Sequence, residues 1–266
     1  MKEIFIAIGV VAAVGFAAGL LLAIVSRFFG VKEDERTKSI RACLPGANCG
    51  ACGYKGCDDY ASALASGNAS PNLCVPGGED TARALGEVLG VKAEAKESRV
   101  AFVHCNGNCE ATSNKAEYEG YSSCRAASMI YGGPGACRYG CLGFGECAAV
   151  CPVGAICVKD GIAHVDTKLC IGCGLCAKAC PRSVISLVPR NAATVVMCNN
   201  KDKGADARRA CTNACIACTK CQKICPAYAV EVKDNLARID YEKCVGCRLC
   251  AEDCPVKCIH LVEFDK

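Results

Sequence analysis

The chain begins with a long apolar segment and continues in shorter segments of mixed polarity. Residues 4–25 are 22 positions without one charged side chain. At about 1.5 Å per residue, a helix of that length spans the roughly 30 Å hydrocarbon core of a bilayer. The pattern therefore predicts a single N-terminal transmembrane helix, with an anchor over residues 1–30. A cleaved secretory signal is the alternative, but its apolar region is usually only about 7–15 residues long.

Basic residues lie mainly after this apolar segment. Lys2 precedes it, whereas five basic residues follow it closely: Arg27, Lys32, Arg36, Lys38 and Arg41. Flanks rich in Lys and Arg stay on the cytoplasmic side of a membrane. We therefore expect a single-pass protein of the inner (cytoplasmic) cell membrane, with its soluble domains on the cytoplasmic side.

Beyond the anchor, the apolar pattern predicts an α+β fold in several parts. A charged linker at 31–41 and helical spacing at 58–66 and 80–89 indicate a small, mostly α domain over 31–90. Apolar segments at 155–158, 184–188, 229–232 and 258–262 predict short strands. These strands belong to two modules, 135–190 and 213–266. Polar insertions that contain Gly and Asn, 91–134 and 191–212, flank the first module.

Composition indicates what holds such a chain together. It has 28 cysteines among 266 residues, no Trp and three His. An aromatic-packed core and a His-rich zinc hydrolase are therefore disfavoured. Cross-links through cysteine, as disulfides or as thiolate-bound metals, must replace part of the core, and the cysteine spacing decides between them.

The charge balance depends on the state of these cysteines. The formal net charge of +4 counts every cysteine as neutral. An oxidised four-iron cluster with its four thiolates carries about −2, so five such clusters would move the net charge to roughly −6. The apparent basicity is no evidence for nucleic acid binding, and we expect no nucleic acid partner.

The first closely spaced cysteines lie in the segment L-P-G-A-N-C-G-A-C-G-Y-K-G-C. They are Cys49, Cys52 and Cys57, and Cys74 follows further along the chain. Four thiolates on glycine-rich backbone, which turns tightly and offers N–H groups to sulfur, predict a metal site. An iron–sulfur cluster is favoured, and zinc held by the same thiolates is the alternative. Cys43 is interpreted as a spare thiol.

The C-terminal half contains an internal repeat, C-x2-C-x2-C-x3-C-P, with three intact copies and one degenerate copy. This run is typical of ferredoxins with two 4Fe-4S clusters, in which the fourth cysteine of each run ligates the other cluster. The expected ligand sets are Cys137, Cys141, Cys147 with Cys180; Cys170, Cys173, Cys176 with Cys151; Cys215, Cys218, Cys221 with Cys254; and Cys244, Cys247, Cys250 with Cys225. Together with the N-terminal set they predict five 4Fe-4S clusters.

The degenerate copy begins at Cys137 and ends at Cys151. Phe144 occupies the position where the intact copies have their middle cysteine. We expect Cys137 to replace the missing ligand and to give a complete cluster in a distorted loop. A three-iron cluster or an empty site is the alternative.

Other cysteines lie outside the repeats. Cys157 and Cys258 fall in apolar segments, where a free cysteine behaves as a small buried hydrophobic residue. Four more lie in the two insertions: Cys105, Cys124, Cys198 and Cys211. If the insertions fold together, these four could form a sixth metal site, with Cys109 as an alternate ligand. A structural role without metal is the competing interpretation.

The apolar anchor, the L-P-G-A-N-C-G-A-C-G-Y-K-G-C segment ending at C-V-P-G-G, and the tandem ferredoxin runs occur here in one chain. In this combination the chain resembles the B subunits of Rnf complexes, membrane-bound ferredoxin:NAD oxidoreductases. The resemblance covers nearly the whole chain. It implies a protein that receives electrons from reduced ferredoxin and passes them to other subunits, which couple NAD+ reduction to Na+ or H+ export. The related Rsx complex, which reduces a redox-sensing regulator, shares this architecture.

The residues alone also favour an electron carrier over a substrate-converting enzyme. Clusters ligated by cysteine pass single electrons and need no catalytic acid, base or nucleophile. The chain has no G-x-G-x-x-G after a strand and no flavin-attachment signal, so we expect no flavin or nicotinamide site on it. A polyferredoxin serving another redox enzyme, such as a hydrogenase or an activase, is the second hypothesis. A zinc-stabilised scaffold is the third.

A few remaining side chains invite a functional interpretation. His104, His164 and His260 are expected to be ordinary core or surface residues. An acidic ferredoxin would dock on basic side chains, and the candidates near the last runs are Lys220, Lys223, Lys243, Arg248 and Lys257.

Overall fold

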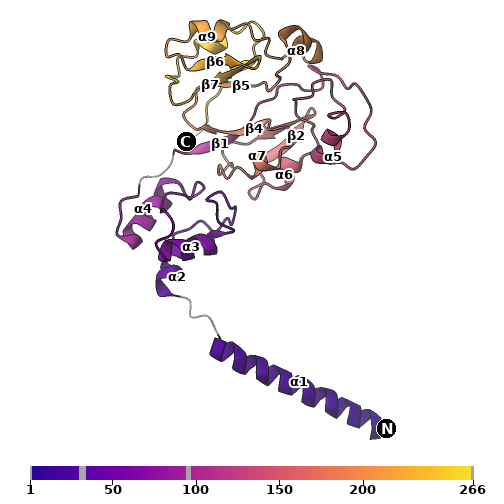
Figure 1. The fold of residues 1–266 in the computed structure, drawn as a ribbon, viewed down its shortest axis with the longest axis vertical. Helices are drawn as coiled ribbons and strands as arrows, with labels where there is room; N and C mark the ends of the chain where they lie inside the picture. The colour runs from indigo at the N-terminus through magenta and orange to yellow at the C-terminus, as the bar shows by residue number, and fades with distance from the viewer. Residues whose placement is uncertain (1, 30–33, 94–96, 265–266) are drawn as a thin grey trace.

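The computed structural model describes residues 2–29, 34–93 and 97–264. The first element is α1 (Lys2–Phe29), which extends away from the other elements in Figure 1. Its described apolar side chains, among them Ile6, Phe16 and Leu22, are exposed. Within the described residues, no helix combines the length and the apolar character that crossing a membrane requires. The transmembrane helix expected over 4–25 is therefore not confirmed.

A small helical domain follows. It consists of α2 (Glu35–Ala42), α3 (Cys57–Ala65) and α4 (Gly78–Leu89). The expected helices over 58–66 and 80–89 are thus present. The supposed linker at 31–41 is wrong in its described part, because α2 lies there: Asp34 caps its first turn and Ile40 is fully buried beside Tyr60 and Leu85.

The predicted strands form antiparallel pairs. In the first module β2 (Ile156–Lys159) pairs with β3 (Ile162–Val165), and in the second β6 (Val230–Lys233) pairs with β7 (Leu236–Ile239). Both hairpins have the same burial pattern, so the sequence repeat is also a structural repeat. These pairs confirm the strands expected at 155–158 and 229–232.

The two insertions supply strands to the modules. The first contributes β1 (Arg99–Val103), which pairs with β4 (Ile185–Pro189), and the second contributes β5 (Thr194–Val196), which pairs with β8 (Ile259–Leu261). Val100 lies opposite Val188, and both are fully buried. Without these strands, β4 and β8 would leave unpaired backbone groups at exposed edges. The insertions are therefore integral parts of the modules and not separate flanking segments.

Short helices complete the fold. They are α5 (Cys124–Met129), α6 (Glu146–Ala149), α7 (Leu175–Ala179), α8 (Gly204–Ala210), α9 (Lys220–Ile224) and α10 (Leu249–Glu252). The buried core of each module consists mostly of Ala, Val, Ile and Cys. With such small side chains, the cysteine sites must contribute much of the stability.

Candidate metal centres

Each of the four ferredoxin runs has one cysteine that is positioned by a short helix. α6, α7, α9 and α10 each follow a residue in the left-handed region, with φ between 60° and 78°. This sharp change of direction places the second residue of each helix inside the module. Those residues are the buried Cys147, Cys176, Cys221 and Cys250.

The four N-terminal cysteines come together as expected, and we call Cys49, Cys52, Cys57 and Cys74 set I. Burial raises the pKa of the Cys74 thiol, and the other three thiols are near enough to raise it further. Asn48 stabilises the turn, because its Oδ1 accepts a hydrogen bond from the Cys57 N–H at 2.8 Å. The structure therefore places the other three thiols of set I near Cys74.

Three of the crossed ferredoxin sets also converge as predicted. We call Cys151, Cys170, Cys173 and Cys176 set III; Cys215, Cys218, Cys221 and Cys254 set IV; and Cys225, Cys244, Cys247 and Cys250 set V. In each set, burial raises the pKa of the third cysteine of a run, and the other three thiols raise it further. The set IV cysteines line one small cavity. The cross-over between paired runs thus brings each set together.

The degenerate run departs from the prediction. The cysteine that joins Cys141, Cys147 and Cys180 is Cys124 and not Cys137. These four, which we call set II, line one small cavity. The pKa of Cys147 is raised to about 12, mainly by burial and in smaller part by the Cys141, Cys124 and Cys180 thiols.

Glu146 explains how Cys124 reaches this position. The Glu146 carboxylate accepts hydrogen bonds from the Ser123 hydroxyl and, at 3.2 Å, from the Arg125 N–H. The start of α5 is thereby held beside the start of α6, and Cys124 lies next to Cys147. Sequence spacing has no signal for this contact, because the two helices are separate in the chain.

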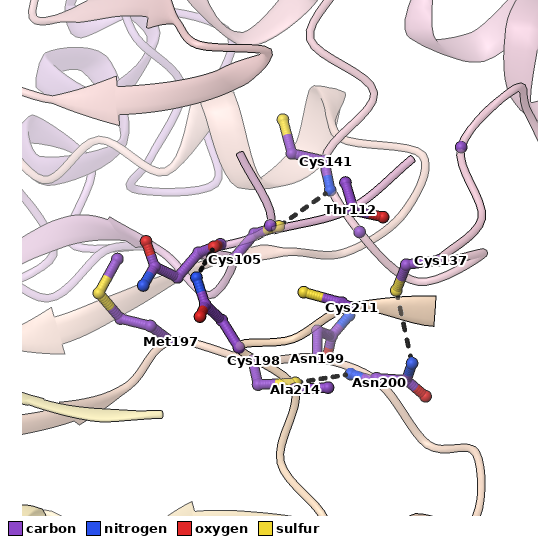
Figure 2. A pocket seen from close by; sticks show the side chains of 15 residues that line it. Cys105, Thr112, Cys137, Cys141, Met197, Cys198, Asn199, Asn200, Cys211 and Ala214 are labelled. Carbon is purple, nitrogen blue, oxygen red and sulfur yellow. Dashed lines mark hydrogen bonds between the residues drawn. The ribbon is translucent and has the colours of Figure 1, made fainter. Parts of the chain in front are cut away.

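Cys137 lies in a different cavity, together with Cys105, Cys198 and Cys211 (Figure 2). Arg138 forms an ion pair with Asp202 at 2.8 Å, and the Asn200 Nδ2 donates to the Cys137 Sγ at 3.5 Å. These contacts draw the start of the degenerate run toward the second insertion. The predicted group of insertion cysteines therefore forms, but with Cys137 in the place of Cys124.

Backbone N–H groups point at many of these sulfur atoms. In set III, the Cys170 Sγ accepts hydrogen bonds from the N–H groups of Ala101 and Gly172, both at 3.4 Å. The Cys151 and Cys225 Sγ atoms accept from the residues four positions later, Ala155 and Ala229, both at 3.3 Å. Such donors favour the thiolate form, which is the form that binds iron.

Cys258 and Cys157 differ in their surroundings. Cys258 is buried as predicted, but its Sγ also lies 3.7 Å from the Cys254 Sγ, and it hydrogen-bonds to Cys215. The pKa of Cys254 is lowered to about 5, mainly by its hydrogen bond with the Cys258 thiol. Cys157 is exposed, so the prediction of a buried residue is wrong there: β2 alternates, and position 157 lies on the outer face.

The remaining candidates are placed as follows. Cys109 is exposed, and the Cys43 Sγ donates to the Ser39 carbonyl oxygen at 3.4 Å. In the part of the chain that the structure describes, no three His, Cys, Asp or Glu side chains form a group tight enough for one bare metal ion. The thiols of sets II and IV line small cavities instead. Four cysteine thiolates are the ligand type of a four-iron cluster.

The candidate docking residues Lys220, Lys223, Lys243, Arg248 and Lys257 are all exposed. Lys243 is paired with Asp240 at 3.1 Å, and Arg248 with Glu263 at 3.4 Å. Cys218 and Cys247 are exposed cysteines of sets IV and V on the same module. The second module therefore has ligand-type sulfur and basic side chains on its surface.

Three protein-family models match parts of the chain. Residues 44–76 match a model for an Fe-S cluster, residues 163–186 a 4Fe-4S binding domain, and residues 208–261 a 4Fe-4S dicluster domain. The matches cover set I, most of set III, and all of sets IV and V.

Longer similarity exists to whole proteins. The chain is 45% identical over 260 residues to the B subunit of the Na+-translocating ferredoxin:NAD+ oxidoreductase complex of Acetobacterium woodii, and the match covers 97% of this chain and 78% of that protein. It is 43% identical over 246 residues to the proton-translocating counterpart of Clostridium ljungdahlii, covering 92% and 87%. The B subunit of an ion-translocating oxidoreductase complex of Methanosarcina acetivorans is 38% identical over 238 residues, covering 89% and 90%.

Proposed function

The chain belongs to the family of B subunits of ion-translocating (Rnf) oxidoreductase complexes, and from this we propose that sets I to V each hold one 4Fe-4S cluster. In this proposal the chain accepts electrons from reduced ferredoxin and relays them to other subunits of such a complex. Those subunits would use the electrons for NAD+ reduction coupled to Na+ or H+ translocation.

The observation that carries the proposal is the convergence of four cysteine thiols in each set. A bound 4Fe-4S cluster supplies the ability to accept and release one electron at a time. The chain's own residues hold the thiolates in place, bury or half-bury all of them except Cys218 and Cys247, and direct backbone N–H groups at the sulfur atoms. Burial and hydrogen bonds of this kind set the reduction potential of such a site.

Ligand sets I and III lie near one another. Cys49 of set I lies close enough to raise the pKa of Cys173 in set III, although burial is the larger cause. Set III in turn shares the first module with set II. The small helical domain and the first module therefore support one continuous route for electrons.

We place the docking site for reduced ferredoxin on the second module. Lys220 and Lys223 lie on α9, beside the exposed Cys218 of set IV, and an acidic carrier would be attracted to this surface. Reversing Lys220 and Arg248 to Glu should slow electron uptake from ferredoxin and reduce its salt dependence. Reversing Arg83, on α4, should change neither; equal effects from both variants would contradict this docking site.

We further propose that α1 attaches the chain to the membrane-bound complex, with the remaining domains in the cytoplasm. The support is the exposed apolar side chains of α1 and the need of thiolate ligands for a reducing compartment. In cells, the full chain should sediment with membranes, whereas a variant lacking residues 1–30 should become soluble. Membrane sedimentation of the shortened variant would refute attachment through α1.

The central experiment measures iron, acid-labile sulfide and zinc per chain after anaerobic purification, followed by stoichiometric reduction with ferredoxin. About 20 iron and 20 sulfide atoms in sets I to V, reducible by ferredoxin, would agree with the proposal. Zinc without sulfide would support a structural scaffold. Iron–sulfur clusters that ferredoxin fails to reduce would instead support service to another redox enzyme.

A further inference from the structure

Four cysteines outside sets I to V converge from four separate segments of the chain. Cys105 follows β1, Cys137 begins the degenerate run, Cys198 follows β5, and Cys211 follows α8. All four line one small cavity and are free thiols. Figure 2 shows them around this cavity, while the Cys141 sulfur points away from the group. We call these four cysteines the bridging set.

Close approaches place their sulfur atoms around a common space. A Cβ added at Gly107 would lie 3.4 Å from the Cys211 Sγ and 3.6 Å from the Cys105 Sγ, so both thiols face the same narrow gap. The Cys137 thiol is near enough to the other three to raise the pKa of each, although burial is the largest cause in each case. Cys137 therefore lies near each of the other three thiols of the bridging set.

The backbone around the bridging set repeats a feature of the ferredoxin runs. Within those runs, the N–H two residues after a cysteine donates to its Sγ, as Gly172 does to Cys170 at 3.4 Å. In the bridging set the same bond runs from Asn200 to Cys198 at 3.4 Å, from Gly107 to Cys105 and from Asn213 to Cys211. Cysteines buried only as hydrophobic residues have no need of this arrangement.

The cavity wall suits a group with negative charge. Among the described residues that line it, none is charged, and most that are not cysteine are Gly or Asn. The fully buried Asn200 serves two ligands: its N–H donates to Cys198, and its Nδ2 donates to Cys137 at 3.5 Å. Amide donors of this kind, with no carboxylate beside them, stabilise negative charge on thiolate and sulfide sulfur.

We propose that Cys105, Cys137, Cys198 and Cys211 hold a further 4Fe-4S cluster that lies between the two ferredoxin modules. The proposal rests on the proposed function of sets I to V. Four soft thiolates are the ligand set of such a cluster.

Direct contacts connect this site to both modules. On one side, the Cys141 N–H of set II donates to the Cys105 Sγ at 3.4 Å. On the other, the Cys215 N–H of set IV donates to the Cys198 Sγ at 3.3 Å. The six sets therefore follow the order I, III, II, bridging, IV, V. Without the bridging set, the route between the modules would have a gap.

The first test is the metal content of the anaerobically purified full chain and of Cys198→Ala. We expect about 24 iron and 24 sulfide atoms in the wild type and a loss of about four of each in the variant, with a matching decrease in the electron paramagnetic resonance spin count of the reduced protein. Cys157→Ala is the matched control, because Cys157 is exposed and outside every set. It should keep the wild-type content.

Paired variants test the ligand assignment. Cys137→Ala combined with Cys198→Ala should still lose only one cluster, about four iron atoms, whereas Cys124→Ala combined with Cys198→Ala should lose two, about eight. The reverse result would return Cys124 to the bridging set and overturn the assignment.

If a variant misfolds and loses most of its iron, the iron count of the wild type decides. About 20 iron atoms would refute the bridging cluster while leaving the proposed function intact. Zinc lost specifically from Cys198→Ala would also refute it, and a wild type with little sulfide would refute both proposals.

Discussion

The Nδ1 of His104 lies 2.7 Å from the carbonyl oxygen of Val196, and this contact joins the two ferredoxin modules. His104 follows β1, which pairs with the first module, and Val196 ends β5, which pairs with the second. The His104 Nε2 lies 2.6 Å from the Ser186 Oγ on β4. Burial lowers the pKa of His104, so a neutral ring can donate to Val196 and accept from Ser186.

Replacing His104 with Leu should therefore destabilise the junction between the modules. The Val196 carbonyl would lose its partner in a half-buried position, at a cost of about 1–3 kcal/mol. Anaerobic thermal unfolding of the cluster-loaded protein should show a lower midpoint. His164→Leu is the control, because His164 lies on the exposed face of β3. Equal midpoints for both variants would argue against a role of His104 in the junction.

Cys258→Ala should lower the reduction potential of the cluster proposed for set IV. Cys258 lies four residues after the last cysteine of its run. At the same position the other three runs have the buried residues Ala155, Val184 and Ala229, so alanine fits there. The variant keeps the backbone hydrogen bond to Cys254 and loses only the thiol that contacts Cys254 and Cys215. Removing a hydrogen bond to a ligating sulfur destabilises the reduced state. A redox titration followed by electron paramagnetic resonance measures the change, and an unaltered potential would show that the thiol has no tuning role.

Arg182→Gln should lower the potential of the cluster in set II by roughly tens of millivolts, because a nearby positive charge stabilises an added electron. Arg182 lines the set II cavity, its guanidinium interacts with Cys137, Cys180 and Cys124, and its Nε is buried without a hydrogen-bond partner. The same titration of Arg83→Gln, a change on α4 far along the chain, provides the control. A shift of equal size in both variants would indicate a general charge effect.

Removal of iron should unfold both modules. Their cores contain mainly small side chains, and the cysteine sets connect segments that are distant in sequence. Without these cross-links the chain does not offset its conformational entropy. Anaerobic chelation should therefore abolish the strand signal in circular dichroism and expose the modules to protease, and iron with sulfide should restore both. A native-like spectrum without iron would contradict this coupling.

The repeated spacing C-x2-C-x2-C-x3-C-P was sufficient to predict the ferredoxin modules, the strands that follow each Cys-Pro, and the crossed grouping of sets III, IV and V. These features are local or are repeated at a fixed separation, so the pattern along the chain contains them. The helices over residues 57–65 and 78–89 were predictable for the same reason.

The positions of Cys124 and Cys137 were decided only by tertiary structure. Spacing assigned Cys137 to the degenerate run, because it is the nearest preceding cysteine. Contacts over long sequence separations favour the opposite arrangement: Glu146 holds Cys124 beside Cys147, while Asp202 and Asn200 hold Cys137 near Cys198. The sequence determined by itself that thiolate sites occur and how the regular ones are grouped. Where a repeat is broken, backbone pairing and side-chain contacts between distant segments decide which cysteines meet.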